Sequence, residues 1–217
     1  METSRITYLF DPLCGWCYGA SDIIVQLAAK KGLSVVLMPS GLFCGWNALP
    51  MDDAMASHSW KTDQRIARLT GKTFSADYHS RILGDRKGRV DSRLATAALT
   101  AVSLTDPEQE LTALRRIQTA RFIEGRDVTS GAVLHQILTD LQLGRAAQMV
   151  QDAPPALAQT SRDRIVASEA LMARLGASSV PALVIGDDTG QRLITTDVMF
   201  ENPDLVTRLS PAWGHTH

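Results

Sequence analysis

The stretch Phe10-Asp11-Pro12-Leu13-Cys14-Gly15-Trp16-Cys17 decides the fold, because its two cysteines stand two residues apart between a strand pattern and a helix pattern. The apolar run 5–10 predicts a short buried strand, and Pro12 predicts a turn because it disfavours helical geometry at the preceding residue. From Tyr18 to Lys31 apolar residues recur at helical spacing, so we expect Cys14 at or just before a helix N-terminus. Unpaired amide groups there stabilise a thiolate, the reactive form of cysteine. The spacing therefore indicates a dithiol that forms and breaks a disulfide.

Composition is that of an ordinary globular protein. The chain has 217 residues, 45% of them apolar and 21% charged, with a formal net charge of −1. No Lys/Arg-rich run is present, which argues against nucleic acid or an anionic membrane as a partner. The first residues carry no secretory signal pattern, and no apolar run is long enough to cross a bilayer. We therefore expect a cytoplasmic protein, in which a cysteine pair is more often catalytic or metal-binding than structural.

The order of the remaining patterns predicts the fold class. A strand over 33–38 completes a strand-helix-strand crossover, and strand signals return only at 180–185 and 191–195, joined by a turn at 187–190. Asp197 is expected to cap a short terminal helix, and Pro203 either lies near the first turn of this helix or breaks it in two. Between these strands we expect helices alone, over 52–69, 75–83, 91–104, 106–122, 130–141, 145–150 and 157–175.

This order predicts an α/β protein with a thioredoxin-like fold and a large all-helical insertion domain. Residues 1–49 and 160–217 are expected to form the thioredoxin-like domain, and residues 50–159 the inserted helical domain.

The segments 10–19 and 179–183 resemble the DsbA-type branch of the thioredoxin superfamily, in its cytoplasmic group of FrnE-like proteins and predicted protein-disulfide isomerases. The resemblance implies that Cys14 is an exposed nucleophile and that Cys17 resolves the mixed disulfide. It also implies a cis peptide bond at Pro181, with Val180 preceding it. The relatives' oxidising potential does not carry over, because Gly15-Trp16 places no histidine between the cysteines.

Three residues are expected to bind substrate: Trp16, Val180 and Pro181. Only an X–Pro bond makes a cis peptide inexpensive, and a cis bond here would turn the Val180 backbone outward to pair with an extended substrate. Trp16 either contacts substrate or covers Cys17.

Two other classes of function stay open. Cys14 and Cys17 are also half of a zinc site, so a metal carrier that adds Cys44 is one alternative. The other is a glutathione-dependent transferase or isomerase of the kappa type, which resembles the chain in element order. Those proteins usually carry serine at the position of Cys14 and lack the second cysteine, which argues against this alternative.

The remaining polar residues are assigned ordinary roles. Asp11 is interpreted as a turn opener more than as an acid or base, and Cys44 as a small buried residue. The arginines of the helix over 106–122, including Arg121, are expected on a solvated face. His58 and His79 are expected to be surface or capping groups.

The sequence thus predicts a thiol-disulfide oxidoreductase acting on protein or peptide thiols and disulfides, with glutathione as a further candidate partner. Cys14 and Cys17 are the expected catalytic residues, and we expect no cofactor and no metal. In a reducing cytosol, reduction or isomerisation is the expected net result, but the spacing leaves the reduction potential open.

Overall fold

A four-stranded sheet organises the computed structural model, which describes residues 4–186 and 190–209. Its order is β2-β1-β5-β6, with β1 parallel to β2 and antiparallel to β5. The strands are β1 (Ser4–Phe10), β2 (Leu33–Pro39), β5 (Ala182–Ile185) and β6 (Arg192–Ile194). The crossover from β1 to β2 passes through α1 (Gly15–Gly19) and α2 (Ser21–Ala28). The predicted parallel strand-helix-strand unit is therefore present.

The central position of β1 brings two distant parts of the chain together. Its residues from Ile6 to Phe10 are all buried, as expected of a strand with a neighbour on each side. Leu9 pairs with Ala182 in the antiparallel register. Residues that follow β1 consequently lie beside residues that precede β5.

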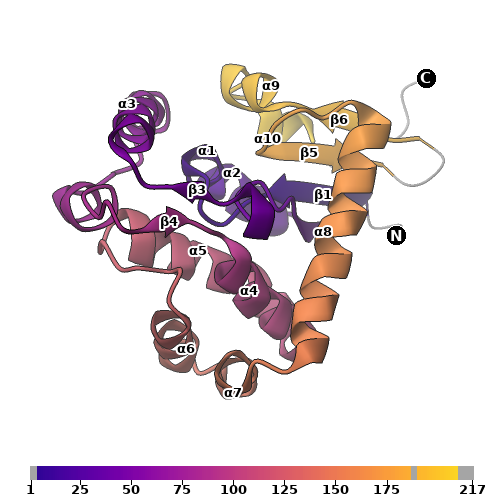
Figure 1. Ribbon diagram of the computed structural model, residues 1–217. Helices are drawn as coiled ribbons and strands as arrows, with labels where there is room; N and C mark the ends of the chain where they lie inside the picture. The colour runs from indigo at the N-terminus through magenta and orange to yellow at the C-terminus, as the bar shows by residue number, and fades with distance from the viewer. Residues whose placement is uncertain (1–3, 187–189, 210–217) are drawn as a thin grey trace.

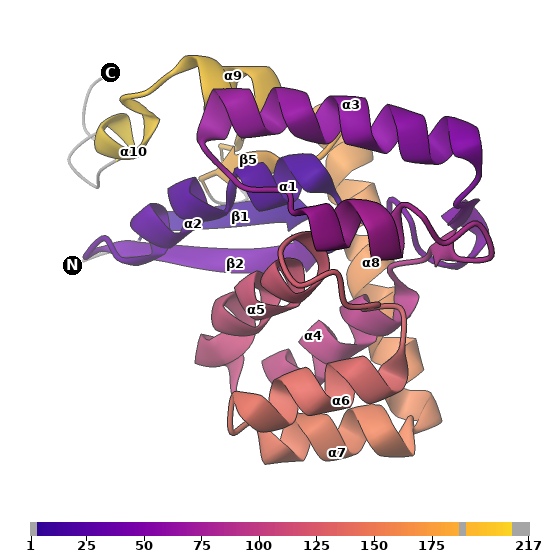
Figure 2. The ribbon, with the colours of Figure 1, turned by 90° about the vertical axis from the view of Figure 1, so that its left-hand side faces the viewer.

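The chain between β2 and β5 is mainly helical. Figure 2 shows α3 over α1 on one side of the sheet and α4, α5, α6 and α7 on the other, whereas α8 runs alongside from α7 back to the sheet (Figure 1). These elements are η1 (Gly45–Asn47), α3 (Asp53–Thr70), the π-helical turn η2 (Tyr78–Ile82), α4 (Arg93–Thr105), η3 (Pro107–Gln109), α5 (Glu110–Phe122), α6 (Gly131–Asp140), α7 (Gly144–Asp152) and α8 (Pro155–Leu175). The predicted domain limits near residues 50 and 160 stay a prediction, because α8 continues across the second one.

Hydrogen bonds of Arg164 tie the helices to the sheet. Its guanidinium on α8 donates to Glu110 Oε1 at 2.6 Å and to the backbone oxygen of Leu37 in β2 at 2.9 Å. One side chain therefore joins α8, α5 and the sheet.

α1 and α3 approach closely because glycine stands where they touch. A Cβ at Gly19 would lie 2.7 Å from Ile66 Cγ2, closer than real Cβ atoms come, and Ile66 is fully buried. The packing of α3 on α1 thus requires the small residue.

Three local expectations are wrong. The helix expected after Cys14 begins at Gly15, as predicted, but it is interrupted at Ala20 and ends at Ala28 instead of Lys31, so it forms α1 and α2. The region expected to be purely helical contains a short antiparallel ribbon, β3 (Leu49–Pro50) with β4 (Arg89–Val90), whose two-residue strands are too short to show a period.

The third concerns the end of the chain. Asp197 is not the N-cap, because it lies in the first turn of α9 (Thr196–Glu201), whose N-cap is Thr195. The terminal helix is divided into α9 and α10 (Leu205–Arg208), which confirms the alternative in which Pro203 breaks it in two. Asn202 has extended geometry just before Pro203, which explains the break. Most of the turn expected at 187–190 falls outside the described residues.

Candidate active site

Cys14 occupies the N-cap of α1, with extended backbone angles (φ −77°, ψ 123°). Cys17 lies one turn further on, fully buried, and both are free thiols. The resemblance implied an exposed first cysteine, but Cys14 is only 7% exposed. It is reached from a cavity and not from the open surface.

The segment before β5 lies directly against Cys14. The Val180–Pro181 peptide bond is cis, and the Cys14 thiol donates to the backbone oxygen of Val180 with an Sγ–O distance of 3.9 Å. The two residues are 166 positions apart in the chain. The pairing of Leu9 with Ala182 brings them together, since each follows or precedes its strand by a few residues.

Cys17 is held as a neutral thiol. Burial raises its pKa well above the usual value, and the hydrogen bond and charge of Cys14 raise it further. The Asp11 amide donates to Cys17 Sγ at 3.5 Å, which opposes this rise. The two cysteines therefore have different environments, one at a cavity and a helix N-terminus and one in the core.

Asp11 does more than open a turn. Its carboxylate accepts from the Leu13 amide at 2.9 Å, which is the predicted turn contact, but also from the Phe43 amide at 3.1 Å and Ser92 Oγ at 2.7 Å. Burial raises its pKa even so. An Asp-Pro pair in a sequence does not indicate which distant donors the carboxylate will meet. The bonds from Phe43 and Ser92 therefore could not be predicted from the sequence.

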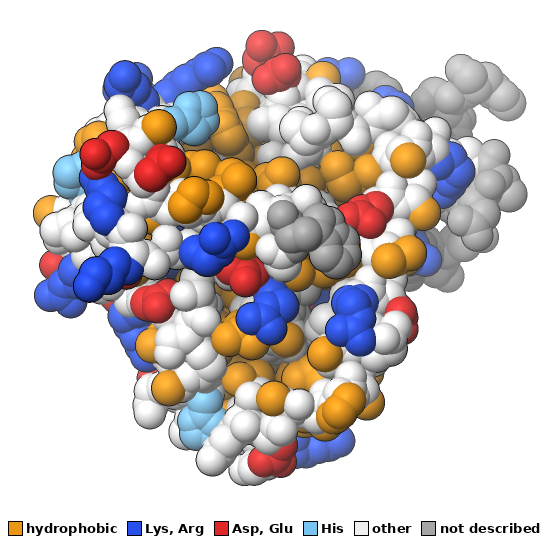
Figure 3. Space-filling model, viewed as in Figure 1, with side chains coloured by type: hydrophobic (Ala, Val, Ile, Leu, Met, Phe, Trp, Pro, Cys, Tyr) orange, Lys and Arg blue, Asp and Glu red, His pale blue; other side chains and the backbone are white. Residues whose placement is uncertain are grey.

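A cavity of about 500 Å³ opens beside Cys14. Hydrophobic side chains gather on the face of the molecule between α3 and α8 (Figure 3). The apolar wall of the cavity includes Leu13, Trp16, Leu42, Leu49, Met55 and Val180. His58, expected to be a surface or capping group, also contributes to the lining.

A polar cluster forms another part of the same cavity wall. Tyr78 O–H of η2 donates to Asp63 Oδ2 of α3 at 2.9 Å, and the guanidinium of Arg121 of α5 lies 5.7 Å from the Tyr78 ring centre. Burial raises the pKa of Asp63 to about 7, although the Tyr78 hydrogen bond and the charge of Arg121 lower it. The expectation of a solvated Arg121 is wrong, because this residue is only 3% exposed. Buried residues occur around most of α5 and include polar ones, so a polar side chain on this helix is not by itself a sign of exposure.

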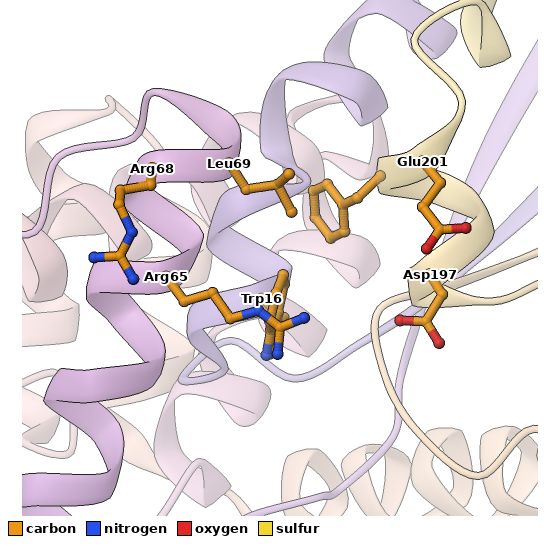
Figure 4. Close-up of a pocket in the computed structure, with 7 residues that line it drawn as sticks. Trp16, Arg65, Arg68, Leu69, Asp197 and Glu201 are labelled. Atoms are coloured by element: carbon orange, nitrogen blue, oxygen red, sulfur yellow. The ribbon is translucent and has the colours of Figure 1, made fainter.

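Trp16 also lines a second cavity, of about 360 Å³. Its ring lies 5.4 Å from Phe200 and 5.6 Å from the guanidinium of Arg65. Figure 4 shows Arg65 and Arg68 projecting from α3 on one side, opposite Asp197 and Glu201 on α9. The cleft thus has an aromatic centre with cationic and anionic walls.

Cys44 does not line the cavity of Cys14. It is half-buried and lines a separate cavity of about 520 Å³, and burial raises its pKa to about 11. Within residues 4–186 and 190–209, no group of three or more His, Cys, Asp or Glu side chains is placed to hold a metal ion.

Residues 5–205 match the DSBA-like thioredoxin domain, and the chain belongs to this family. Among solved structures it is similar to the cytosolic disulfide reductase DsbM from Pseudomonas aeruginosa, at 33% identity and a TM-score of 0.82, covering 92% of this chain and 93% of that one. The same protein with GSH matches at 32% identity and a TM-score of 0.81, covering 92% and 94%.

A protein from Nitrosomonas europaea that is described as a candidate protein disulfide isomerase shares the fold, at 24% identity and a TM-score of 0.77, covering 95% of each chain. No match was found among curated proteins. Within the described part of the chain, no helix combines the length and the apolar character that a membrane span needs.

Proposed function

We propose that this protein is a disulfide reductase in which Cys14 is the nucleophile and Cys17 the resolving thiol. The observation that carries the proposal is the asymmetry of the pair: Cys14 caps a helix at a cavity, whereas Cys17 is buried behind it and held as a thiol. A thiolate is the attacking form, and a helix N-terminus favours it. The resolving thiol must wait until the mixed disulfide exists.

The reaction has two exchanges. Cys14 thiolate attacks one sulfur of the substrate disulfide, forms a mixed disulfide and releases the other sulfur as a thiolate, which takes up a proton. Cys17 then loses its proton and attacks Cys14 Sγ, which releases the second substrate thiol and leaves a Cys14–Cys17 disulfide. The Asp11 amide, 3.5 Å from Cys17 Sγ, is placed to stabilise the developing thiolate. The substrate gains two electrons and the cysteine pair loses them.

Substrate contacts are proposed for the three residues around the thiol. The Val180 backbone would pair with an extended substrate next to Cys14, and Pro181 would fix the start of β5 beneath it. Trp16 would contact the substrate chain next to the substrate's reacting cysteine. The walls of the cleft that Trp16 lines carry both positive and negative side chains.

Glutathione is proposed as the electron donor. A relative at 32% identity over 92% of this chain has been solved with GSH, and it is described as a cytosolic reductase. Two glutathione molecules would return the Cys14–Cys17 disulfide to two thiols and leave as oxidised glutathione. We propose the cytosol as the location on the same ground.

The test is reduction of insulin by the purified protein, with Cys14→Ser and Cys17→Ser beside the matched control Cys44→Ser. We expect Cys14→Ser to abolish turnover and Cys17→Ser to accumulate a mixed disulfide on Cys14. Cys44→Ser should keep the wild-type rate, because Cys44 lines another cavity. Insulin precipitation no faster than in a blank would contradict the proposal.

The direction of net transfer is tested by equilibrating the Cys14–Cys17 pair in glutathione buffers. A potential near about −270 mV, as in thioredoxin, supports a reductase, and one near about −120 mV an oxidase. Glutathione-dependent turnover that survives Cys17→Ala would favour the kappa-type alternative instead. A stoichiometric metal in the reduced protein would favour a metal carrier.

A further inference from the structure

Asp63 lines the same cavity as Cys14, although it comes from α3, far from the cysteine motif in the chain. Its carboxylate contacts Gly15, the residue that follows Cys14, so that a Cβ at Gly15 would collide with Asp63 Oδ1. Asp63 is only 3% exposed, and it lines the same cavity as Cys14. A buried carboxyl thus stands at the N-terminus of α1, where a substrate sulfur would enter.

The surroundings of Asp63 leave it able to gain and lose a proton. Tyr78 O–H donates a hydrogen bond to Asp63 Oδ2, while Asp63 Oδ1 faces Gly15. Burial favours the neutral acid, and the Tyr78 hydrogen bond and the Arg121 charge favour the carboxylate, so its pKa is raised only to about 7. A proton donor is most effective when its pKa lies near the working pH.

We propose that the Asp63 carboxyl donates a proton to the substrate sulfur that leaves when Cys14 attacks a disulfide. This rests on the proposed role of Cys14. The Cys14–substrate S–S bond forms as the substrate's own S–S bond breaks, and the departing sulfur takes the electron pair and the proton of Asp63. In the reverse direction the Asp63 carboxylate accepts the proton of an incoming thiol.

The other titratable and charged groups of the cavity are less suited to this transfer. His58 and Arg65 are exposed side chains on α3. At an exposed position, water can supply a proton to the leaving sulfur as well, so these side chains add less than a buried acid does. Burial raises the pKa of Tyr78 well above its usual value, and a guanidinium such as that of Arg121 does not serve as a proton donor in proteins. Asp63 is the buried acid of this wall beside Cys14.

The experiment compares two uncharged disulfides that differ in their leaving sulfur. Bis(2-hydroxyethyl) disulfide releases a basic thiolate that needs a proton on sulfur. In contrast, 2,2′-dithiodipyridine releases pyridine-2-thiolate, whose charge is delocalised onto the ring nitrogen, so no proton has to reach the departing sulfur. Rate constants for both are measured with the reduced protein by stopped flow at pH 6.5. Their ratio cancels changes in the ionisation of Cys14, in its access and in the fraction of folded protein.

Asp63→Asn is the main variant, because Asn keeps the shape and an oxygen acceptor for Tyr78. We expect the ratio of the bis(2-hydroxyethyl) disulfide rate to the dithiodipyridine rate to fall at least tenfold, since proton transfer typically contributes about 10²–10⁴-fold. Asp53→Asn, on the exposed start of the same helix, should leave the ratio unchanged. If the ratio in Asp63→Asn stays within twofold of the wild-type ratio, the proposal is overturned. This includes the case in which both rate constants fall by the same factor.

The pH dependence supplies a second readout. In the wild type the ratio should decrease as the pH rises through about 7, because only the protonated carboxyl donates. Tyr78→Phe removes the hydrogen bond that favours the carboxylate, so the decrease should move to higher pH. The same profile in Tyr78→Phe and in wild type would contradict the assignment. If Cys14 of the wild type reacts with neither disulfide, the proposed function itself fails.

Discussion

Replacing Asp63 by Asn should change how protein stability depends on pH. Burial raises the pKa of this carboxyl from 3.8 to about 7 in the folded protein. The native state therefore binds more protons than the unfolded state between these two values, so stability falls as the pH rises through this window. At about 1.4 kcal/mol per pH unit, the full loss amounts to about 4 kcal/mol.

Asn carries no proton in this range and escapes the loss. Between pH 5 and pH 8 the difference in unfolding free energy between Asp63→Asn and wild type should shift by about 3 kcal/mol in favour of the variant. Urea denaturation of the reduced proteins, followed by tryptophan fluorescence at several pH values, measures this shift. Asp53→Asn is the control, since Asp53 is exposed. A difference between Asp63→Asn and wild type that is the same at pH 5 and pH 8 would refute the reasoning.

Three further predictions concern packing, a buried ion pair and the third cysteine. Ile66→Ala should cost about 2–5 kcal/mol in urea denaturation because Ile66 is 0% exposed, while Leu69→Ala on the same helix, at 52% exposed, should change stability by less than about 0.5 kcal/mol. Arg164→Met should lower the free energy of unfolding by about 3–5 kcal/mol, because it leaves the buried Glu110 carboxylate without its partner. Adding Glu110→Gln should recover part of this loss, and no recovery in the double variant would contradict the prediction. Iodoacetamide at pH 8 should label Cys44 much more slowly than Cys14, since a pKa of about 11 leaves only about one Cys44 thiol in a thousand ionised; mass spectrometry showing equal labelling would contradict it.

Local signals in the sequence determined the parts of the site that lie next to one another in the chain. The apolar run 5–10, the turn at Pro12 and the helical spacing after Tyr18 placed Cys14 at a helix N-terminus, as the structure has it. Such patterns suffice because backbone sterics and burial on one face act over a few residues. The α/β fold class followed from the order of these elements.

Only the tertiary structure decided what surrounds the thiols. Register between β1 and β5 brings Val180 to Cys14, and the packing of α3, η2 and α5 brings Asp63, Tyr78 and Arg121 to one cavity wall. Hydrophobic periodicity reports which face of a helix is buried, but it does not report which other helix covers that face. A polar residue inside a buried helix therefore has the same local pattern as a solvated one, and its partners become visible only when the helices are packed together.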